Sequence, residues 1–141
     1  MAAFNKFNSF VEHVSEKVHN LGADTLKVML TDVAPVATNT VKADLTEISA
    51  GNGYTAGGTA ATISASAQSS GTYKLTLGDV VFTASGGAIA QFRYAVLYND
   101  TPTSPADPLI GWWDHGSEVN LATGETFTWD ADATAGVLTI A

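Results

Sequence analysis

The residues best suited to chemistry in this chain are three histidines and two groups of aspartates. His13 and His19 are six positions apart, a spacing that places two side chains on different sides of a helix, and His115 is distant in the sequence. A zinc site requires ligands that cluster in space, so this spacing argues against one. We therefore expect all three histidines to be exposed, and we expect the chain to bind no metal and no cofactor.

The aspartates raise two further possibilities, which are carboxylate catalysis and calcium binding. Asp100, Asp107 and Asp114 flank a proline-rich stretch, while Asp130 and Asp132 lie close together near the C-terminus. Paired carboxylates can serve glycoside hydrolysis or hold calcium. These aspartates lack the regular ligand spacing of an EF-hand loop. We interpret them as hydrated loop residues.

Other catalytic signatures are missing from the sequence. The absence of cysteine excludes disulfides, thiolate nucleophiles and cysteine-bound metal clusters. There is no Gly-x-Ser-x-Gly motif for acyl transfer. The glycine-rich stretch 50–58 (AGNGYTAGG) lacks the Lys-Ser/Thr end of a phosphate-binding loop, so we interpret it as a turn-rich loop that anchors Tyr54 on the domain. We expect no enzyme and assign no catalytic residue.

Two short features concern carbohydrate. Asn99, Asp100 and Thr101 match the acceptor pattern for N-glycosylation, a pattern short enough to arise by chance. Trp112 and Trp113 are of the type that stacks on sugar rings. Because neighbouring residues on a strand face opposite ways, we expect one of the two tryptophans in the core and the other at an interface.

Hydrophobic spacing indicates the elements that position these residues. The stretch 91–114 carries the clearest hairpin: a strand at 92–98, a loop at 99–108 with three prolines, and a second apolar run from residue 109. Its first strand is mostly apolar on both faces, which is typical of a strand in the middle of a sheet or between layers. The alternation predicts that Phe92, Tyr94, Val96 and Tyr98 share one face.

Residues 4–21 carry the only convincing helical pattern, with apolar residues at intervals of three and four. Gly22 is the predicted C-cap. We expect this amphipathic helix to cover one open end or face of the sheet. In the alternative, its three phenylalanines, Phe4, Phe7 and Phe10, dock onto a neighbouring subunit.

The rest of the chain alternates as strands do, with turn signals about every ten residues. The segment 41–48 is either a second short amphipathic strand or a helical turn. The fold class we expect is mainly β: one domain over residues 1–141, in which an antiparallel, jelly-roll-like β-sandwich (25–141) follows the N-terminal α-helix. Strands are predicted at 25–31, 73–77, 79–84, 89–98, 118–121, 126–129 and 136–140, and 59–67 is predicted as an edge strand or as a surface covered by another subunit.

Composition limits the partners. Fourteen acidic and six basic residues give a formal net charge of −8, which argues against nucleic acid binding. No window has the length and apolarity of a membrane span, so we expect no membrane partner. The first twenty residues lack the apolar block of a signal peptide, so we expect the protein to start out in the cytoplasm. Charged residues make up only 14% of the chain, and a surface with few ions is easier to bury against a protein.

Several segments together resemble small virion proteins of tailed bacteriophages. They are FNKFNSFVEHVSEKVHNLGADTLKVMLTDVAP (4–35), AGNGYTAGG (50–58), QFRYAVLYND (91–100), PLIGWWDHGS (108–117) and LATGETFTWD (121–130). The resemblance implies a capsid decoration or cement protein that stabilises the phage head by binding the major capsid protein, often as a trimer. Its location would be the virion, assembled in the host cytoplasm. The resemblance identifies no partner-binding residues.

Two alternatives remain open. Within the same class, the protein is a component of the phage tail or of a head fibre. In a different class, it is a carbohydrate-binding β-sandwich in which Trp112, Trp113 and the aspartates are the candidate residues.

Overall fold

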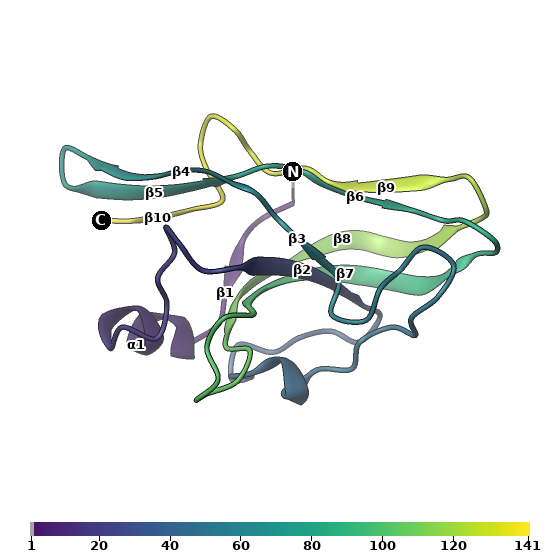
Figure 1. The fold of residues 1–141 in the computed structure, drawn as a ribbon, viewed down its shortest axis with the longest axis horizontal. Coiled ribbons are helices and arrows are strands. Elements are labelled where there is room, and N and C mark those ends of the chain that lie inside the picture. The colour runs from purple at the N-terminus through teal and green to yellow at the C-terminus, as the bar shows by residue number, and fades with distance from the viewer. Residues whose placement is uncertain (1) are drawn as a thin grey trace.

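The computed structural model describes residues 2–141 and consists mainly of antiparallel strands in two facing layers (Figure 1). The mainly β, antiparallel β-sandwich that the sequence predicts is confirmed, while its jelly-roll topology stays a prediction. One layer is a five-stranded sheet in the order β1 (Asn5–Lys6), β8 (Leu109–Leu121), β7 (Ile89–Asn99), β2 (Leu26–Thr31) and β3 (Thr59–Ala60). The other holds β10 (Leu138–Ile140), β5 (Thr72–Leu77) and β4 (Ile63–Ser69), in that order, and the pair of β6 (Val80–Thr83) with β9 (Thr126–Trp129).

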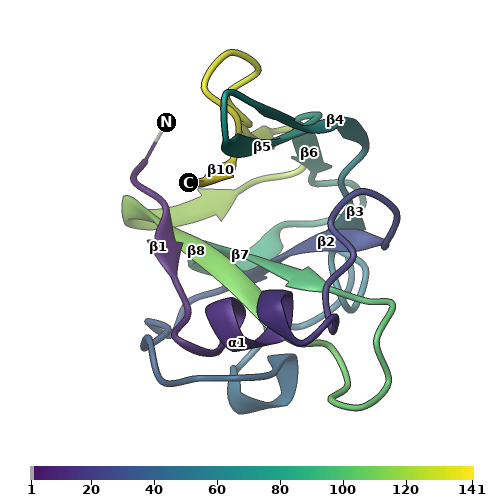
Figure 2. The same cartoon turned by 90° about the vertical axis from the view of Figure 1, so that its left-hand side faces the viewer.

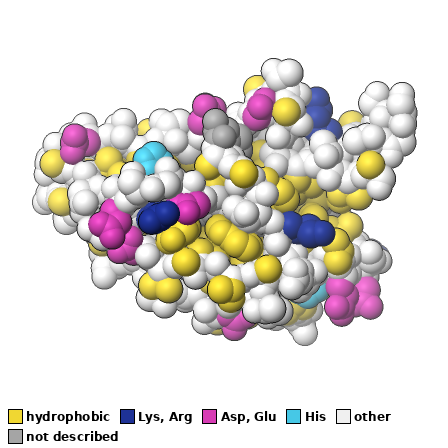
Figure 3. All heavy atoms as spheres, turned by 180° about the vertical axis from the view of Figure 1, so that it is seen from behind, with side chains coloured by type: hydrophobic (Ala, Val, Ile, Leu, Met, Phe, Trp, Pro, Cys, Tyr) yellow, Lys and Arg dark blue, Asp and Glu magenta, His cyan; other side chains and the backbone are white. Residues whose placement is uncertain are grey.

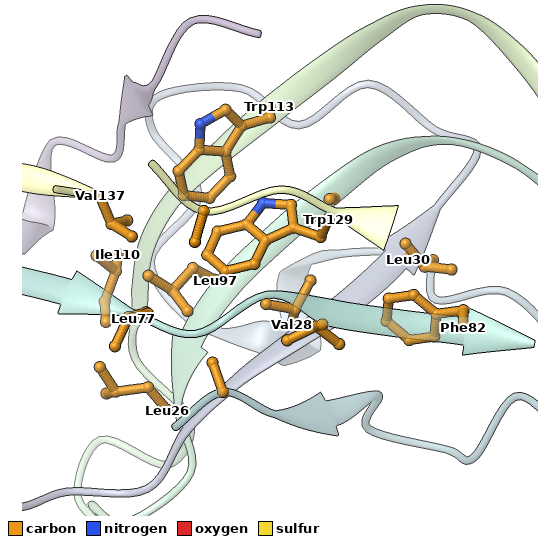
Figure 4. Close-up of a cluster of buried hydrophobic side chains, with 14 of the residues drawn as sticks. Leu26, Val28, Leu30, Leu77, Phe82, Leu97, Ile110, Trp113, Trp129 and Val137 are labelled. Carbon is orange, nitrogen blue, oxygen red and sulfur yellow. The ribbon is translucent and has the colours of Figure 1, made fainter. Parts of the chain in front are cut away.

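The main hydrophobic core fills the space between the two layers. Leu26, Val28 and Leu30 alternate along β2 and enter this core from the five-stranded sheet (Figure 4). Phe82 and Trp129 enter it from the opposite layer (Figure 4). Complete burial of one such side chain stabilises a fold by about 1.5–3 kcal/mol, so this cluster is the principal source of stability.

A second cluster lies on the other face of the five-stranded sheet, away from the main core. It is covered by the irregular segment 32–58, which includes the short 3-10 helix Lys42–Asp44 (Figure 1). The Tyr98 hydroxyl donates a hydrogen bond to the carbonyl oxygen of Gly57 (2.6 Å) and ties this segment to the sheet. Both faces of β7 are therefore buried, as predicted. The buried members of this second cluster are Phe7, Met29, Val96, Tyr98 and Leu109.

A β-bulge changes the face of one predicted core residue. Phe92 pairs with Val119 but Tyr94 pairs with Asp114, which leaves residues 115–118 of β8 opposite a single residue of β7. On β7 the irregular pairing coincides with a break in the alternation, because Phe92 and Ala95 both lie in the main core although they are three positions apart. Phe92 consequently lies in the main core, whereas the predicted alternation put it on the opposite face with the other even-numbered residues of the strand.

The N-terminal helix is much shorter than the predicted range of 4–21, because α1 spans only Ser9–Ser15. Asn5–Lys6 are extended as β1 and pair with Trp112 and Gly111 of β8. The apolar residues before the helix keep a spacing of three, which an extended segment followed by a helical turn satisfies as well as a long helix does. Of the predicted range 4–21, only the middle part, Ser9–Ser15, is helical.

A hydrogen-bonded reversal ends α1, so the predicted C-cap at Gly22 is wrong. Lys17 adopts a φ of 67°, in the left-handed region. The N–H of Val18 donates to the carbonyl oxygen of His13 (2.8 Å), and the N–H of Lys17 donates to that of Val14 (3.4 Å). This pair of bonds is a Schellman motif, which satisfies the last carbonyl groups of a helix.

The N-terminal phenylalanines pack within their own chain. The ring of Phe4 lies 5.4 Å from that of Trp113, and the ring of Phe7 lies 4.6 Å from that of Trp112, measured between centroids. Phe7 and Phe10 are 0% and 3% exposed. The N-terminal segment thus closes one end of its own sandwich (Figure 2). Docking of all three phenylalanines onto a neighbour is excluded, because Phe7 and Phe10 have no free surface.

Most predicted strands appear with small shifts of their ends. The prediction of a separate strand at 118–121 is wrong, because these residues are the last part of β8. The segment 41–48 contains a helical turn and no strand. The predicted edge segment 59–67 forms β3 and most of β4, and both lie at sheet edges.

Candidate functional site

Two histidines that the sequence analysis separated lie together. The rings of His13 and His19 meet edge to face, with centroids 5.8 Å apart. His19 is only 7% exposed. The prediction that all three histidines are exposed is therefore wrong for His19, because the chain reverses after Ser15 and folds this residue back against the helix. It is wrong for His13 as well, since His13 is half-buried. His115 is exposed, as predicted.

Buried polar side chains surround His19. The side-chain amide nitrogen of Asn99 lies 3.1 Å from Nδ1 of His19 and donates a second hydrogen bond to Asp24 (2.6 Å). Burial, together with the neighbouring His13, lowers the pKa of His19 to about 4, although Asp24 opposes this shift. His19 is consequently neutral at pH 7. Because Asn99 is the donor, Nδ1 of His19 accepts and its proton is on Nε2.

The burial of Asn99 shows whether the acceptor motif at residues 99–101 can carry a glycan. Asn99 is fully buried, and its amide nitrogen is engaged by two partners. Its side-chain oxygen accepts the N–H of Thr101 (3.1 Å), which closes the loop locally. A glycan on Asn99 would need space that the fold does not leave. The match of residues 99–101 to the acceptor pattern is therefore a chance match.

The aspartates around the β7–β8 hairpin bind neighbouring groups, which corrects their interpretation as hydrated loop residues. Asp114 accepts two hydrogen bonds from Arg93 (2.8 and 3.1 Å), and this contact holds its pKa below the usual range. Asp100 forms an ion pair with Lys27 at 3.0 Å. Burial, followed by the charge of Asp100, raises the pKa of Asp107. The contacts of Asp114 and Asp100 thus link β7 to β8 and to β2, whereas the ionised form of Asp107 is disfavoured in the fold.

The C-terminal aspartates differ from each other. Asp132 accepts the N–H groups of Thr134 and Ala135, both at 2.8 Å, and so shapes the turn before β10. Those hydrogen bonds lower the pKa of Asp132. Asp130 is exposed at the end of β9. Among residues 2–141, no group of three or more histidine or acidic side chains is arranged to hold a metal ion.

The glycine-rich stretch 50–58 is a structural loop, as predicted. Its aromatic residue, Tyr54, is buried. The hydroxyl of Tyr54 accepts the N–H of Leu30 (3.1 Å) and donates to the carboxylate of Glu47 (2.7 Å). Gly58 has a φ of 79°, and a Cβ atom there would overlap the carbonyl of Val28. The glycines thus let the loop approach β2 closely, with no sign of a phosphate cradle.

Trp112 and Trp113 face opposite ways, as predicted, but they do not form a platform for sugars. Trp113 lies in the core, edge to face with Trp129, with centroids 5.0 Å apart and planes at 75°. Trp112 is half-buried against Phe7 and belongs to the second cluster. The two indoles therefore line different sides of the five-stranded sheet.

A cavity of about 210 Å³, which we call the tryptophan cavity, lies where β9 passes over the bulged part of the β7–β8 hairpin. The sequence did not predict this cavity, because its walls come from strands of both layers. No pattern within one stretch of sequence indicates which strands of the two layers face each other. Trp113 was singled out from the sequence, but Trp129 and Phe127 were not. The side chains that define this cavity are Arg93, Trp113, His115, Phe127, Trp129 and Asp130.

A second hollow, the α1–β10 groove, has a volume of about 230 Å³. Val11 of α1 and Ile140 of β10 lie at its rim and are 51% and 37% exposed. Lys6 is the charged side chain in its lining. Seen from behind, the molecule shows hydrophobic side chains gathered across the middle of one face, between acidic and basic groups (Figure 3). The apolar lining of the groove consists of Phe4, Phe10, Val11, Val14, Leu138 and Ile140.

Comparison of the chain with protein-family models, with characterised proteins and with solved structures gives no match. No helix within residues 2–141 has the length and apolarity to cross a membrane.

Proposed function

We propose that this protein is a structural component of a phage virion, and that it acts as a capsid decoration or cement protein by binding the major capsid protein. The observation that carries the proposal is the α1–β10 groove. Val11 and Ile140 expose apolar side chains on either side of it, next to the buried core residues Phe10 and Leu138. A groove of this kind accepts an apolar segment of another chain.

Sheet edges beside the groove support a protein partner. Among residues 2–141, β10 pairs with β5 alone and β1 pairs with β8 alone. Each of these strands therefore keeps one edge whose backbone groups can hydrogen-bond to an added strand. An extended arm of a partner could pair with β10 while its side chains enter the groove. Backbone pairing would supply affinity, and the groove would supply selectivity.

The charge of the chain favours association with protein. Only 14% of the residues are charged. Burying such a surface removes few ions from water, so the desolvation cost is small. The net charge of −8 also favours solubility of the free protein. A cement protein that occupies many equivalent sites gains strength from multiplicity, and trimeric assembly, which we include in the proposal, adds to that gain.

The test is to locate the protein in purified phage particles and to vary the rim of the groove. The protein should co-purify with particles and lie outside the head shell in electron cryomicroscopy. Val11→Lys and Ile140→Lys should lower its occupancy, because each places a charge against the apolar partner. Val81, which is 53% exposed on β6, provides the matched control: Val81→Lys should bind normally.

Three results would contradict the proposal. Absence of the protein from particles would exclude a virion role. An equal loss of binding in the Val81→Lys control would show that the α1–β10 groove is not the specific binding surface. Density on the tail or on a fibre would replace the decoration role by the tail or head-fibre alternative.

A further inference from the structure

We propose that the tryptophan cavity binds one ring of a neutral carbohydrate. This inference goes beyond the proposed virion role and does not depend on it, because the cavity and the α1–β10 groove share no lining residue. The Trp112–Trp113 pair that the sequence suggested for sugar binding is not the site. Instead, Trp113 acts with residues that the fold brings from β9.

Aromatic rings form the walls of the cavity and are held rigidly. Trp113 and Trp129 pack edge to face at 5.0 Å, and both are 4% exposed. The half-buried ring of Phe127 is fixed from below by Phe92, at 5.0 Å and 72°. The ring of His115 lies 5.6 Å from that of Phe127. The rings of Phe127 and His115 keep free surface and suit the apolar faces of a sugar, since little side-chain freedom is lost when the sugar binds to rings that are already held in place.

The two tryptophans also leave hydrogen-bond donors without partners. Neither indole N–H, of Trp113 or of Trp129, has an acceptor among residues 2–141, and both nitrogens are buried. The Trp129 nitrogen is on the side of its ring that faces Trp113, away from Leu97 and Val28 (Figure 4). Buried donors are nearly always satisfied in folded proteins, so two together call for an explanation. Hydroxyl oxygens are acceptors of the required kind, and we infer that a sugar ring in the adjoining cavity supplies them where its hydroxyls reach the edges of the two indoles.

Charge selects a neutral ligand. The guanidinium of Arg93 is engaged by the carboxylate of Asp114 through two hydrogen bonds, so it does not offer a free positive charge. The other carboxylate of the cavity, Asp130, accepts hydrogen bonds and repels anions. A ligand with both donor and acceptor hydroxyls fits this combination better than a carboxylate does. A volume of about 210 Å³ is below the range of drug-sized sites and suits a single sugar ring.

The three indole N–H groups of the chain allow a direct test by NMR. The 15N-labelled protein is titrated with D-glucose, D-galactose and N-acetyl-D-glucosamine. Trp112→Phe identifies the signal of Trp112, which is outside the cavity and serves as the internal reference. The signals of Trp113 and Trp129 should shift saturably with at least one sugar, with a dissociation constant on the order of 1 mM, while that of Trp112 stays in place.

Variants then connect the shifts to the cavity. Phe127→Ala removes a wall and should weaken binding by about tenfold or more. Asp130→Asn keeps the shape of an exposed residue and should weaken binding if the carboxylate accepts a sugar hydroxyl. An unchanged Trp112 signal in each variant checks that the fold is kept. His13→Gln, remote from the cavity lining, should bind like the parent protein.

Definite outcomes would overturn the inference. These are the absence of a saturable shift with all three sugars, a response confined to Trp112, or unchanged binding by the Phe127→Ala protein. D-glucuronate is the remaining arm of the test. If it binds more tightly than D-glucose, the cavity takes an anion, and the assignment of a neutral ligand is wrong.

Discussion

The ring of Phe4 occupies the space next to Gly111 where any larger residue would place its Cβ atom. Phe4 precedes β1 and Gly111 lies in β8, so the missing side chain of one lets the other pack on Trp113. Figure 2 shows how this N-terminal strand runs along the edge of the five-stranded sheet. The fit attaches the first residues to the body of the fold.

Gly111→Ala should therefore destabilise the protein by about 1–3 kcal/mol, the usual cost of overpacking. The free energy of unfolding, measured in urea, checks this. Gly78→Ala is the matched control, because a Cβ atom at Gly78 meets nothing closer than 3.8 Å and its φ is not in the left-handed region. The control should change stability by less than about 0.5 kcal/mol. Equal effects of the two substitutions would exclude the steric explanation.

Val96→Ala tests the burial of β7 on its second face. Val96 is fully buried in the cluster under the segment 32–58. Removal of its methyl groups leaves a cavity that the irregular cover fills only in part, and we expect a loss of about 2–3 kcal/mol. The same substitution at the exposed Val81 should have almost no effect. A loss below about 0.5 kcal/mol at Val96 would show that this face is open to solvent.

His19 should make stability depend on pH. Its pKa falls from 6.5, the value of an unperturbed histidine, to about 4 in the fold, mainly through burial. The folded state binds this proton less readily than the unfolded chain, so the contribution is complete above about pH 6.5 and is lost as the pH falls towards 4. The expected loss is about 1–3 kcal/mol at pH 4. His19→Gln, followed by urea unfolding across this range, should flatten the curve.

Other groups titrate near the lower end of that range, so the comparison needs a control. His115→Gln removes an exposed histidine and should leave the loss attributed to His19 in place. His13 is in ring contact with His19 and shares its environment, so His13→Gln should move the midpoint of the loss to higher pH, because one neighbouring positive charge is removed. A His19→Gln curve that parallels the parent would contradict the role of this residue.

Deletion of residues 1–10 should destabilise the protein strongly, because it removes Phe7 and Phe10 from buried positions. Truncation of one such ring to alanine alone costs about 3–5 kcal/mol. Deletion of residues 1–3 is the control and should cost little, since Ala2 and Ala3 are exposed. Thermal unfolding followed by circular dichroism distinguishes the two. A stable protein after removal of ten residues would mean that these rings do not contribute to the core.

The strands were predictable from the sequence because successive side chains of a strand point to opposite faces. The residue types along the strand therefore indicate what covers each face. The apolar residues of 92–98 indicated burial on both faces, and the two clusters that flank β7 confirm it. Tyr54 was predicted to anchor the glycine-rich loop, and its hydroxyl does so by contacting Leu30 and Glu47. In these places a local pattern determines the local structure.

The errors occur where long-range contacts override local patterns. A spacing of three among the first phenylalanines predicts a helix, but the indoles of β8 hold Phe4 and Phe7 beside an extended strand. A lysine in the left-handed region ends the helix, and lysine gives no signal for that conformation. The meeting of His13 and His19 follows from that reversal. The tryptophan cavity depends on how β9 crosses β8, which no spacing along the chain reveals.

The irregular segment 32–58 packs on the outer face of the five-stranded sheet, a face that many sandwiches expose to water. Hydrogen bonds of Tyr54 and Gly57 fix its last part to β2 and β7, so residues 54–58 are held firmly against the sheet. Insertions or grafted peptides should consequently be rejected at 54–58, although a glycine-rich sequence is typical of loops that tolerate them. A position open to such engineering is the tip of the β4–β5 hairpin at 69–71, which lies outside both clusters.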